Sequence, residues 1–468
     1  MKPTVFPLAT DRVRVTMEDL AQAIVEAQRC LHCPRPTCRT GCPIGNEIPQ
    51  FIAELAVGNI GAAIRIINER SNLPSVCGRV CPHENQCQGH CILNRRHQPV
   101  KIGLIESVIG DVANAMMLNT PRRLPRKKEK VAVIGSGPAG LTVANDLRQL
   151  GYNIDVYDSA AEPGGVLLHG IPSFRINKAV VRFETERLAA MGVKFLCGQT
   201  FGKDFTLADL EADGYQAVFL GVGTTQPRDL PLQNDDLPGV LQAMDVLHAA
   251  QALADHQLTK EEFVIQREDR VVVIGAGNVA MDAARTALRA GARKVTVAYR
   301  RTQEFMACLP SEYEAAAAEG VEFRFLAAPI GVSGHEKVGA FIYEEQAIND
   351  LGELHGTGKR EEIIADKVII AVGHVPSTLL RASLPDLEND QAGYIRVRKE
   401  PYYGATNLPG VFAAGDIVHR PATVVLAMRE AKKTAQGMAA YMDKLAAAAK
   451  EAAEGKKDAA KNQNTPAK

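Results

Sequence analysis

The sequence contains no tryptophan, and aromatic residues make up only 5% of its 468 positions. Basic and acidic residues both number 54, so the formal net charge is zero and no overall basic field points to nucleic acid. No run of about 18 apolar residues is present, so no transmembrane helix is predicted. The first residues lack the apolar core and cleavage site of a signal peptide. We therefore expect a cytoplasmic protein that binds neither membranes nor nucleic acid.

What remains is the composition of an ordinary folded protein, with 46% hydrophobic and 23% charged residues. The chain is too long for one ordinary domain, which favours two to four domains. Its unusual feature is cysteine: eight of the ten cysteines lie between Cys30 and Cys91. In a reducing compartment such crowding indicates metal or redox chemistry more often than disulfides.

The crowded cysteines form two sets of four, each containing a Cys-Pro step. Closely spaced thiolates are soft ligands typical of iron–sulfur clusters, whereas zinc more often uses two CxxC knuckles separated by a longer loop. We predict two [4Fe–4S] clusters, with zinc or disulfides as the alternatives. A fourth cysteine can bind the neighbouring cluster, so contiguous sets need not be ligand sets. Cys197 and Cys308 stand alone and are predicted to be buried thiols. The first set is Cys30, Cys33, Cys38 and Cys42, and the second is Cys77, Cys81, Cys87 and Cys91.

After residue 130 the pattern changes to short apolar strands that alternate with helices, which is typical of α/β architecture. The strand at 131–134 runs into a glycine fingerprint and a helix, and the next strand ends in Asp158. The glycines suit a tight turn and close approach to a pyrophosphate at the helix N-terminus, while the acid suits ribose hydroxyls. We predict a dinucleotide site here, with Gly135, Gly137, Pro138, Ala139, Gly140 and Asp158 as binding residues.

Two further segments favour FAD as the dinucleotide at the first site. Gly164 and Gly165 follow Asp158 closely, and a late strand ends in Gly415 and Asp416, just before Thr423 and Val424. A carboxylate at the end of that strand can lie near a flavin ribityl chain. An ordinary strand-to-turn Gly-Asp step is the alternative.

The α/β pattern begins a second time at Val271. There the fingerprint has alanine as its third small residue, which dinucleotide sites tolerate. The next strand ends in Arg300 and Arg301 instead of an acid, and two guanidinium groups can bind a 2′-phosphate. This favours NADPH over NADH, although a surface arginine pair capping a strand is the alternative. The predicted binding residues are Gly275, Gly277, Asn278, Val279, Arg300 and Arg301.

In this combination and order, the motifs resemble those of the glutamate synthase small-subunit family. The resemblance rests on the cysteine spacing, VAVIGSGPAG, EPGG with GIPSFR, GAGNVAMDAAR with YRR, and GVFAAGD, and it covers residues 20–445. The same module is similar to the large subunit of ferredoxin–NADP transhydrogenase and to the N-terminal half of dihydropyrimidine dehydrogenase. Ala431 and Lys432 stand where Gly-Arg or Gly-Lys is common in the family, so alanine takes the place of the glycine.

The resemblance implies a helical two-cluster domain followed by an adrenodoxin-reductase-like FAD domain with an inserted NADPH domain. It also implies interleaved ligands. Cys30, Cys33, Cys38 and Cys91 would bind one cluster, and Cys42, Cys81, Cys87 and Glu106 the other. Cys77 would then be a neighbour of the second cluster. Arg175, Gly223 and Gly373 complete the expected cofactor-binding residues.

These expectations give an α/β protein with a helical iron–sulfur domain and two Rossmann-like domains. The basic linker at 121–130 is interpreted as a solvated hinge, with a docking patch as the alternative. The tail is expected to be a fraying helix and then disorder. The predicted boundaries are 1–120 for the cluster domain, 121–245 and 373–445 for the FAD domain, 246–372 for the NADPH domain and 446–468 for the tail.

The function expected is an FAD-dependent NAD(P)H oxidoreductase subunit that passes electrons to or from a partner subunit. The flavin would accept the hydride, so no protein residue is expected to be catalytic. A glutamate synthase small subunit is the first hypothesis. A subunit of a bifurcating transhydrogenase or hydrogenase is the second, and a cluster-bearing scaffold without turnover is the third.

The cluster and flavin assignments predict the cofactor content. Protein purified anaerobically should contain one FAD and about eight irons with matching acid-labile sulfide per chain, because two cubane clusters hold four irons each. Metal, sulfide and flavin analysis of the same sample measures this. Zinc in place of iron in a careful anaerobic preparation would overturn the cluster assignment.

Overall fold

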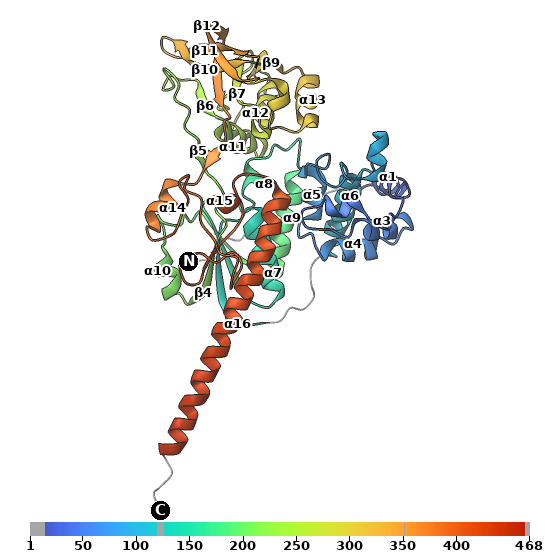
Figure 1. Ribbon diagram of the computed structural model, residues 1–468, viewed down its shortest axis with the longest axis vertical. Helices are drawn as coiled ribbons and strands as arrows, with labels where there is room; N and C mark the ends of the chain where they lie inside the picture. Colours follow the sequence, from blue (N-terminus) through green and yellow to red (C-terminus); the bar gives the residue numbers. More distant parts are fainter. Residues whose placement is uncertain (1–14, 119–125, 351, 464–468) are drawn as a thin grey trace, which may run out of the picture. The chain divides into compact units, whose positions relative to one another are not determined.

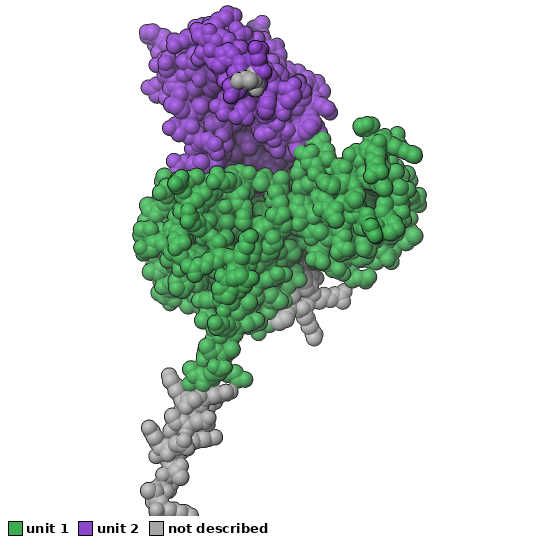
Figure 2. Space-filling model, in the orientation of Figure 1, with its two compact units in different colours: residues 1–165, 178–224, 376–468 green, residues 166–177, 225–375 purple. Residues whose placement is uncertain are grey.

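The computed structural model describes residues 15–118, 126–350 and 352–463. These residues fall into two compact units (Figure 2). The first unit lies within residues 1–165, 178–224 and 376–468, and the second within 166–177 and 225–375. Both contain strands and helices, which confirms the α/β class. Among the described residues, no helix has the length and apolarity needed to span a membrane.

The first unit begins with a helical domain, and residues 15–118 contain no strand, as the sequence predicts. Apolar side chains three and four residues apart in α3, including Phe51, Ile52 and Leu55, are buried in its core. The elements are α1 (Met17–Ala27), α2 (Thr37–Thr40), α3 (Ile48–Ala56), α4 (Ile60–Asn68), α5 (Pro74–Val80), the 3₁₀ helix η1 (Ile92–Arg96) and α6 (Ile102–Ala115).

Glycines allow α5 and α6 to pack in close contact. A Cβ atom on Gly110 would lie 2.5 Å from the backbone nitrogen of Ser75, and one on Gly78 would lie 2.4 Å from that of Ser107. Arg79 of α5 also donates to the Asp111 carboxylate of α6 at 2.9 Å. This contact fixes α6, which carries Glu106, against α5, which carries Cys77.

The rest of the first unit is a five-stranded parallel sheet in the order β15-β4-β1-β2-β3, with helices packed against it (Figure 1). Its apolar strands and the buried face of α7 share one core. The strands are β1 (Lys130–Ile134), β2 (Asn153–Asp158), β3 (Lys194–Cys197), β4 (Tyr215–Leu220) and β15 (Val411–Ala413). The helices are α7 (Pro138–Gln149), α9 (Lys178–Ala190), α10 (Leu207–Ala212), α14 (Thr378–Ser383), α15 (Asp416–His419) and α16 (Val424–Gln463).

The second unit has its own five-stranded parallel sheet, in the order β6-β13-β7-β8-β9. Its strands are β6 (Val240–Gln242), β7 (Arg270–Ile274), β8 (Lys294–Ala298), β9 (Glu322–Arg324) and β13 (Lys367–Ile370). Its helices are α8 (Val166–His169), α11 (Ala243–Ala254), α12 (Asn278–Arg289), η2 (Gln303–Phe305) and α13 (Pro310–Glu319).

Two features of the second unit differ from the sequence expectations. An antiparallel sheet of β10 (Ala327–Gly334), β11 (Val338–Ile348) and β12 (Leu354–Ile364) was not predicted. A short pair, β5 (Gln226–Pro227) with β14 (His374–Val375), was also not predicted. In addition, the expected boundary at 245 lies inside α11, and β6 pairs with β13 of the second unit. The glycine motif marks β7, but β6 and α11 of this unit precede that motif and carry no such signal.

Polar contacts join the helical domain to the sheet domain within the first unit. The Lys432 ammonium of α16 donates to the Asn72 side chain at 2.7 Å and pairs with Asp146 of α7 at 3.1 Å. Lys432 therefore holds three segments together. In the basic linker, residues 121–125 lie outside the described residues, while Lys127 pairs with Asp443 of α16 at 2.9 Å.

For the tail after residue 445, the sequence predicts a fraying helix followed by disorder. Helix α16 continues through Gln463 (Figure 1). The residues concerned are rich in alanine, lysine and glutamate, which have high helix propensity, so a helix can extend there without an apolar stripe. Residues 464–468 lie outside the described residues.

The contact between α5 and α6 predicts opposite effects for two glycine-to-alanine variants. Gly110→Ala should destabilise the protein by about 1–3 kcal/mol, because the new methyl group meets the α5 backbone. Gly61→Ala, at an exposed position in α4 with open space around it, should instead stabilise by about 0.5–1 kcal/mol. Urea unfolding of the full chain followed by circular dichroism compares them. Equal effects of the two variants would contradict this account of the packing.

Candidate cofactor-binding sites

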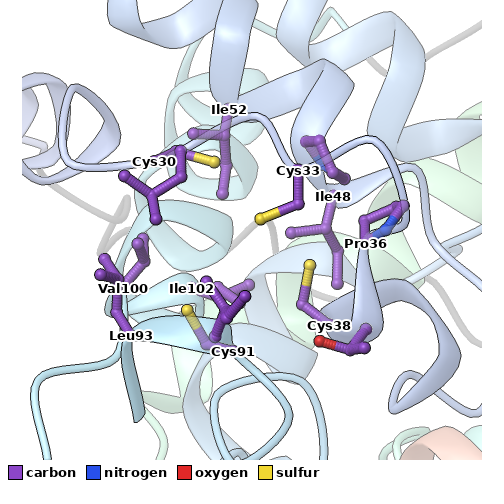
Figure 3. A pocket seen from close by; sticks show the side chains of 14 residues that line it. Cys30, Cys33, Pro36, Cys38, Ile48, Ile52, Cys91, Leu93, Val100 and Ile102 are labelled. Atoms are coloured by element: carbon purple, nitrogen blue, oxygen red, sulfur yellow. The ribbon is translucent and has the colours of Figure 1, made fainter. Parts of the chain in front are cut away.

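Four cysteines from two distant loops of the helical domain line a single pocket. Cys30, Cys33 and Cys38 come from the first loop, and Cys91 comes from the second. Figure 3 shows their sulfur atoms directed toward a shared space. Apolar side chains such as Ile48, Ile52, Val100 and Ile102 form the rest of the lining. We call these four residues the outer cysteine group.

The outer group has the protonation expected of a binding site without its metal. Burial, together with the neighbouring Cys91 and Cys30, raises the pKa of Cys38 to about 11. Burial likewise raises the pKa of Cys30. The thiols of Cys30 and Cys38 therefore hold their protons at neutral pH, and a cluster would bind them as thiolates with release of those protons.

A second set of thiols lies around a buried carboxyl group. Burial raises the pKa values of Cys42 and Cys87, and a hydrogen bond with Cys77 together with burial raises that of Cys81. All three thiols also lie close enough to Glu106 for its charge to raise their pKa values. Cys42 and Cys87 also influence each other. We call Cys42, Cys81, Cys87 and Glu106 the inner group.

Glu106 has the environment of a ligand more than that of a structural residue. It is only 7% exposed, and burial raises its pKa to about 8. Within the described residues its side chain has no hydrogen-bond or ion-pair partner. A buried polar group without a partner is costly, and coordination to iron would remove that cost.

Cys77 lies beside the inner group. It is 1% exposed, its thiol hydrogen-bonds with that of Cys81, and its sulfur lies 3.5 Å from that of Met428 in α16. The structure thus brings both Cys77 and Glu106 to the same thiols. Which of them is the eighth ligand stays a prediction.

The spacing within these groups differs from that of a single-ion site. Within residues 15–118, 126–350 and 352–463, no three His, Cys, Asp or Glu side chains lie close enough together to hold one metal ion. A cubane cluster binds its four ligands through different irons, so the ligands lie farther apart.

In the first glycine fingerprint, the first and third glycines are closely packed, whereas the second has open space beside it. A Cβ atom on Gly135 would lie 2.5 Å from the Gly221 carbonyl oxygen, and one on Gly140 would lie 1.9 Å from that of Gly135. A Cβ atom on Gly137 would meet nothing within 4 Å. Gly137 is also the N-cap of α7, so a phosphate could approach its backbone and the helix N-terminus. This opening fits the dinucleotide that the sequence predicts.

Other predicted residues gather around this turn. The Asp158 carboxylate accepts hydrogen bonds from the N–H and the hydroxyl of Ser136, at 2.7 and 2.5 Å. The Gly164 N–H donates to the Ser136 hydroxyl oxygen at 2.9 Å, and Gly165 lies against Gly137. Sequence reasoning did not single out Ser136, which links the glycine turn to both segments. The contact of Asp158 with ribose hydroxyls stays a prediction.

The segment around Gly415 and Asp416, near the end of the first unit, lies beside the first glycine fingerprint. Strand β15 pairs with β4, which pairs with β1, and a Cβ atom on Gly415 would lie 3.0 Å from that of Ala139. Burial raises the pKa of Asp416 to about 6. Gly223, with φ of +64°, follows β4, and Thr423 and Val424 lie where α16 begins. The structure therefore brings the two distant FAD segments together.

The second glycine fingerprint repeats this geometry in the second unit. Gly275, with φ of +131°, packs against the Ala371 carbonyl, whereas a Cβ atom on Gly277 would meet nothing within 4 Å. Asn278 begins α12, and its side-chain oxygen accepts from the Leu309 N–H at 3.0 Å. The N–H groups of Ala307 and Cys308 donate to the Ala276 carbonyl. This loop against the fingerprint was not foreseen, because its sequence has no glycine signal.

The arginines after β8 are available to bind an anion. Arg300 is exposed and has no side-chain hydrogen bond or ion pair among the described residues. Among the described residues, the Arg301 side chain contacts only the Phe305 ring, and its guanidinium lies 5.9 Å from the ring centre. Arg285 and Arg289 of α12, by comparison, pair with Glu319. The free guanidinium groups suit a 2′-phosphate.

Arg175 has a setting that the sequence did not predict. Its guanidinium pairs with Asp282 at 2.8 Å and with Glu312 at 3.0 Å, all within the second unit. Cofactor binding by Arg175 stays a prediction, as does that of Val279 and of Gly373, which follows β13. Of the isolated cysteines, Cys308 is buried as predicted, while Cys197 is only partly buried.

Two known families match the chain, one over the helical domain and one over the residues that follow it. Residues 10–118 match the family described as dihydropyrimidine dehydrogenase domain II, 4Fe-4S cluster. Residues 129–431 match the pyridine nucleotide-disulphide oxidoreductase family. The glutamate synthase [NADPH] small chain of Escherichia coli K12 is 38% identical over 438 residues, covering 90% of this chain and 92% of that protein. The corresponding small chain of Halomonas elongata is 37% identical, covering 90% and 91%.

Solved structures share the fold. FprA from Mycobacterium tuberculosis in complex with NADPH has a TM-score of 0.56 and 23% identity, covering 70% of this chain and 87% of that one. Thioredoxin reductase from T. acidophilum has a TM-score of 0.52 and 20% identity, covering 68% and 100%. At these identities the likeness concerns the fold alone.

The setting of the inner group predicts different outcomes for Glu106 and Cys77. Glu106→Ala should lose one cluster, about half of the iron, while FAD stays bound, since removing one of its four ligands destabilises a cluster. Cys77→Ala should keep most of its iron. Iron, sulfide and flavin content measure both, and Cys308→Ala controls for loss of a buried thiol elsewhere. If Cys77→Ala loses the cluster and Glu106→Ala keeps it, Cys77 takes the place of Glu106 as the fourth ligand beside Cys42, Cys81 and Cys87.

Proposed function

This chain belongs to the glutamate synthase small-chain family, and from that premise we propose that it supplies electrons from NADPH to a partner subunit. It is an FAD-dependent NAD(P)H oxidoreductase. The observation that carries the proposal is that each of its two glycine fingerprints has an open middle glycine, at Gly137 and at Gly277. One chain can therefore bind two dinucleotides, as transfer between a nicotinamide and a flavin requires.

We assign FAD to the first unit. Gly137 and the N-terminus of α7 would hold the pyrophosphate, and Asp158 would accept the ribose hydroxyls. Asp416 begins α15 and follows Gly415, which contacts Ala139 of the first fingerprint, so its carboxyl group would meet the ribityl chain. The buried site keeps the pKa of that carboxyl above its ordinary value, so it can donate or accept a hydrogen bond near neutral pH.

We assign NADPH to the second unit. Gly277 and the N-terminus of α12 would hold its pyrophosphate. Arg300 and Arg301 would bind the 2′-phosphate, because neither is paired with a carboxylate among the described residues. The loop at 305–309, held on Ala276, would close one side of the site.

We assign one [4Fe–4S] cluster to the outer cysteine group and a second to the inner group. When bound, the flavin would supply the conversion of a two-electron hydride into single electrons, which the clusters carry. In the glutamate synthase assignment, the partner is the large subunit that makes glutamate. Ten free cysteines fit a reducing compartment, and we place the protein in the cytoplasm.

The coenzyme assignment predicts the effect of removing the two arginines. Replacing both Arg300 and Arg301 by alanine should raise the KM for NADPH about ten- to a thousandfold, because charged hydrogen bonds contribute about 1.5–3 kcal/mol each. NADH-driven dye reduction should change little, since NADH lacks the 2′-phosphate. Steady-state kinetics with both coenzymes measure this.

Arg293→Ala is the matched control, because Arg293 is exposed on the same unit and its side chain has no partner in the described part of the chain. Its KM for NADPH should stay at the wild-type value. A double variant that keeps its preference for NADPH would show that the two arginines are surface caps and would refute the assignment.

A further inference from the structure

The two cysteine groups occupy different positions in the first unit. The inner group adjoins Cys77, whose sulfur contacts Met428 of α16 at 3.5 Å. Met428 lies about one turn along α16 from Val424, at the start of the helix, where the flavin segment ends. The outer group instead lines a pocket that includes exposed side chains: Leu31 is 59% exposed and Ile92 is 44% exposed. The inner group therefore lies on the flavin side and the outer group at the surface.

The surface around the outer group is basic. Residues 28–41 and 88–101, which carry all four outer cysteines, contain six lysines and arginines and no acidic residue, although the whole chain is neutral. Arg29 and Arg39 are paired with Glu26 and Glu47. Arg35, Arg95 and Arg96 are exposed, and their side chains have no hydrogen bond or ion pair within the described residues.

We propose that Leu31, Ile92, Arg35, Arg95 and Arg96 form the docking surface for the electron-transfer partner, which we call the exit surface. The partner that fits it is a redox protein whose own centre is surrounded by aspartate and glutamate. The two apolar side chains would be covered on docking, and the three arginines would steer the acidic partner to the outer cluster. This inference rests on the proposed function, since it takes the outer group to hold a cluster.

The charge pattern distinguishes docking from a local role of the arginines. If the arginines only offset the charge of a bound cluster, they would affect its reduction potential, and this effect would be the same with or without a partner. Arginines that steer a partner affect the rate of encounter, and this effect weakens as salt screens the charges.

The test uses the anaerobic holoprotein and a plant-type [2Fe–2S] ferredoxin, a small acidic iron–sulfur protein, as the probe. Pre-reduced ferredoxin is mixed with the oxidised protein, and reduction of its flavin and clusters is followed by stopped-flow absorbance. The second-order rate constant should fall with added NaCl. The triple variant Arg35→Glu, Arg95→Glu and Arg96→Glu should lower it about tenfold or more at low salt, as expected when steering is reversed.

Controls separate this inference from the proposed function. Arg65→Glu with Arg70→Glu reverses two exposed, unpaired arginines of the same domain outside the pocket lining, and should change the rate much less. NADPH-driven reduction of a neutral dye by the flavin should stay at the wild-type rate in every variant. Its loss in the wild-type protein would count against the proposed function instead. Equal rates for the triple variant and its control, or a shifted cluster potential with an unchanged rate, would overturn the exit surface.

Discussion

The helical domain must bring thiols from two distant parts of the sequence together around each proposed cluster site, and its packing serves this constraint. Cys91 joins Cys30, Cys33 and Cys38 in one pocket although more than fifty residues separate it from them in the sequence. The closely packed pair of α5 and α6 brings Cys77 and Glu106 to the remaining thiols. Helix packing is therefore what arranges the ligands, and the short helices between the cysteines serve to place the loops.

The same domain is tied to the flavin-binding sheet by contacts of different kinds. Lys432 joins Asn72 to Asp146 through polar bonds, and Met428 meets Cys77 through sulfur. Both α16 residues lie four positions apart, so they are on one face of that helix. A fixed distance between a flavin and a cluster is useful for electron transfer, and a helix that contacts both regions can maintain it.

The two predicted nucleotide sites have the same backbone geometry. In each, a strand ends in a tightly packed glycine, the next glycine of the fingerprint is open, and a helix begins. They differ after the second strand, where the first has Asp158 and the second has Arg300. The acid is held by Ser136, whereas the arginine has no partner among the described residues. This difference in charge and pairing is the physical basis for assigning different dinucleotides.

The sequence by itself determined the fold class, the two glycine turns and the family. These depend on local signals, since a strand, a glycine turn and a helix follow one another within some thirty residues. The interleaved cysteine sets came only with the family resemblance, because spacing along the chain cannot say which loops meet. Tertiary structure alone decided that Gly415 lies on Ala139, that Lys432 joins three segments, and that β6 and α11 belong to the second unit. The exposed arginines around the outer group also appeared only in three dimensions, because whether a charge is paired depends on neighbours that are remote in sequence.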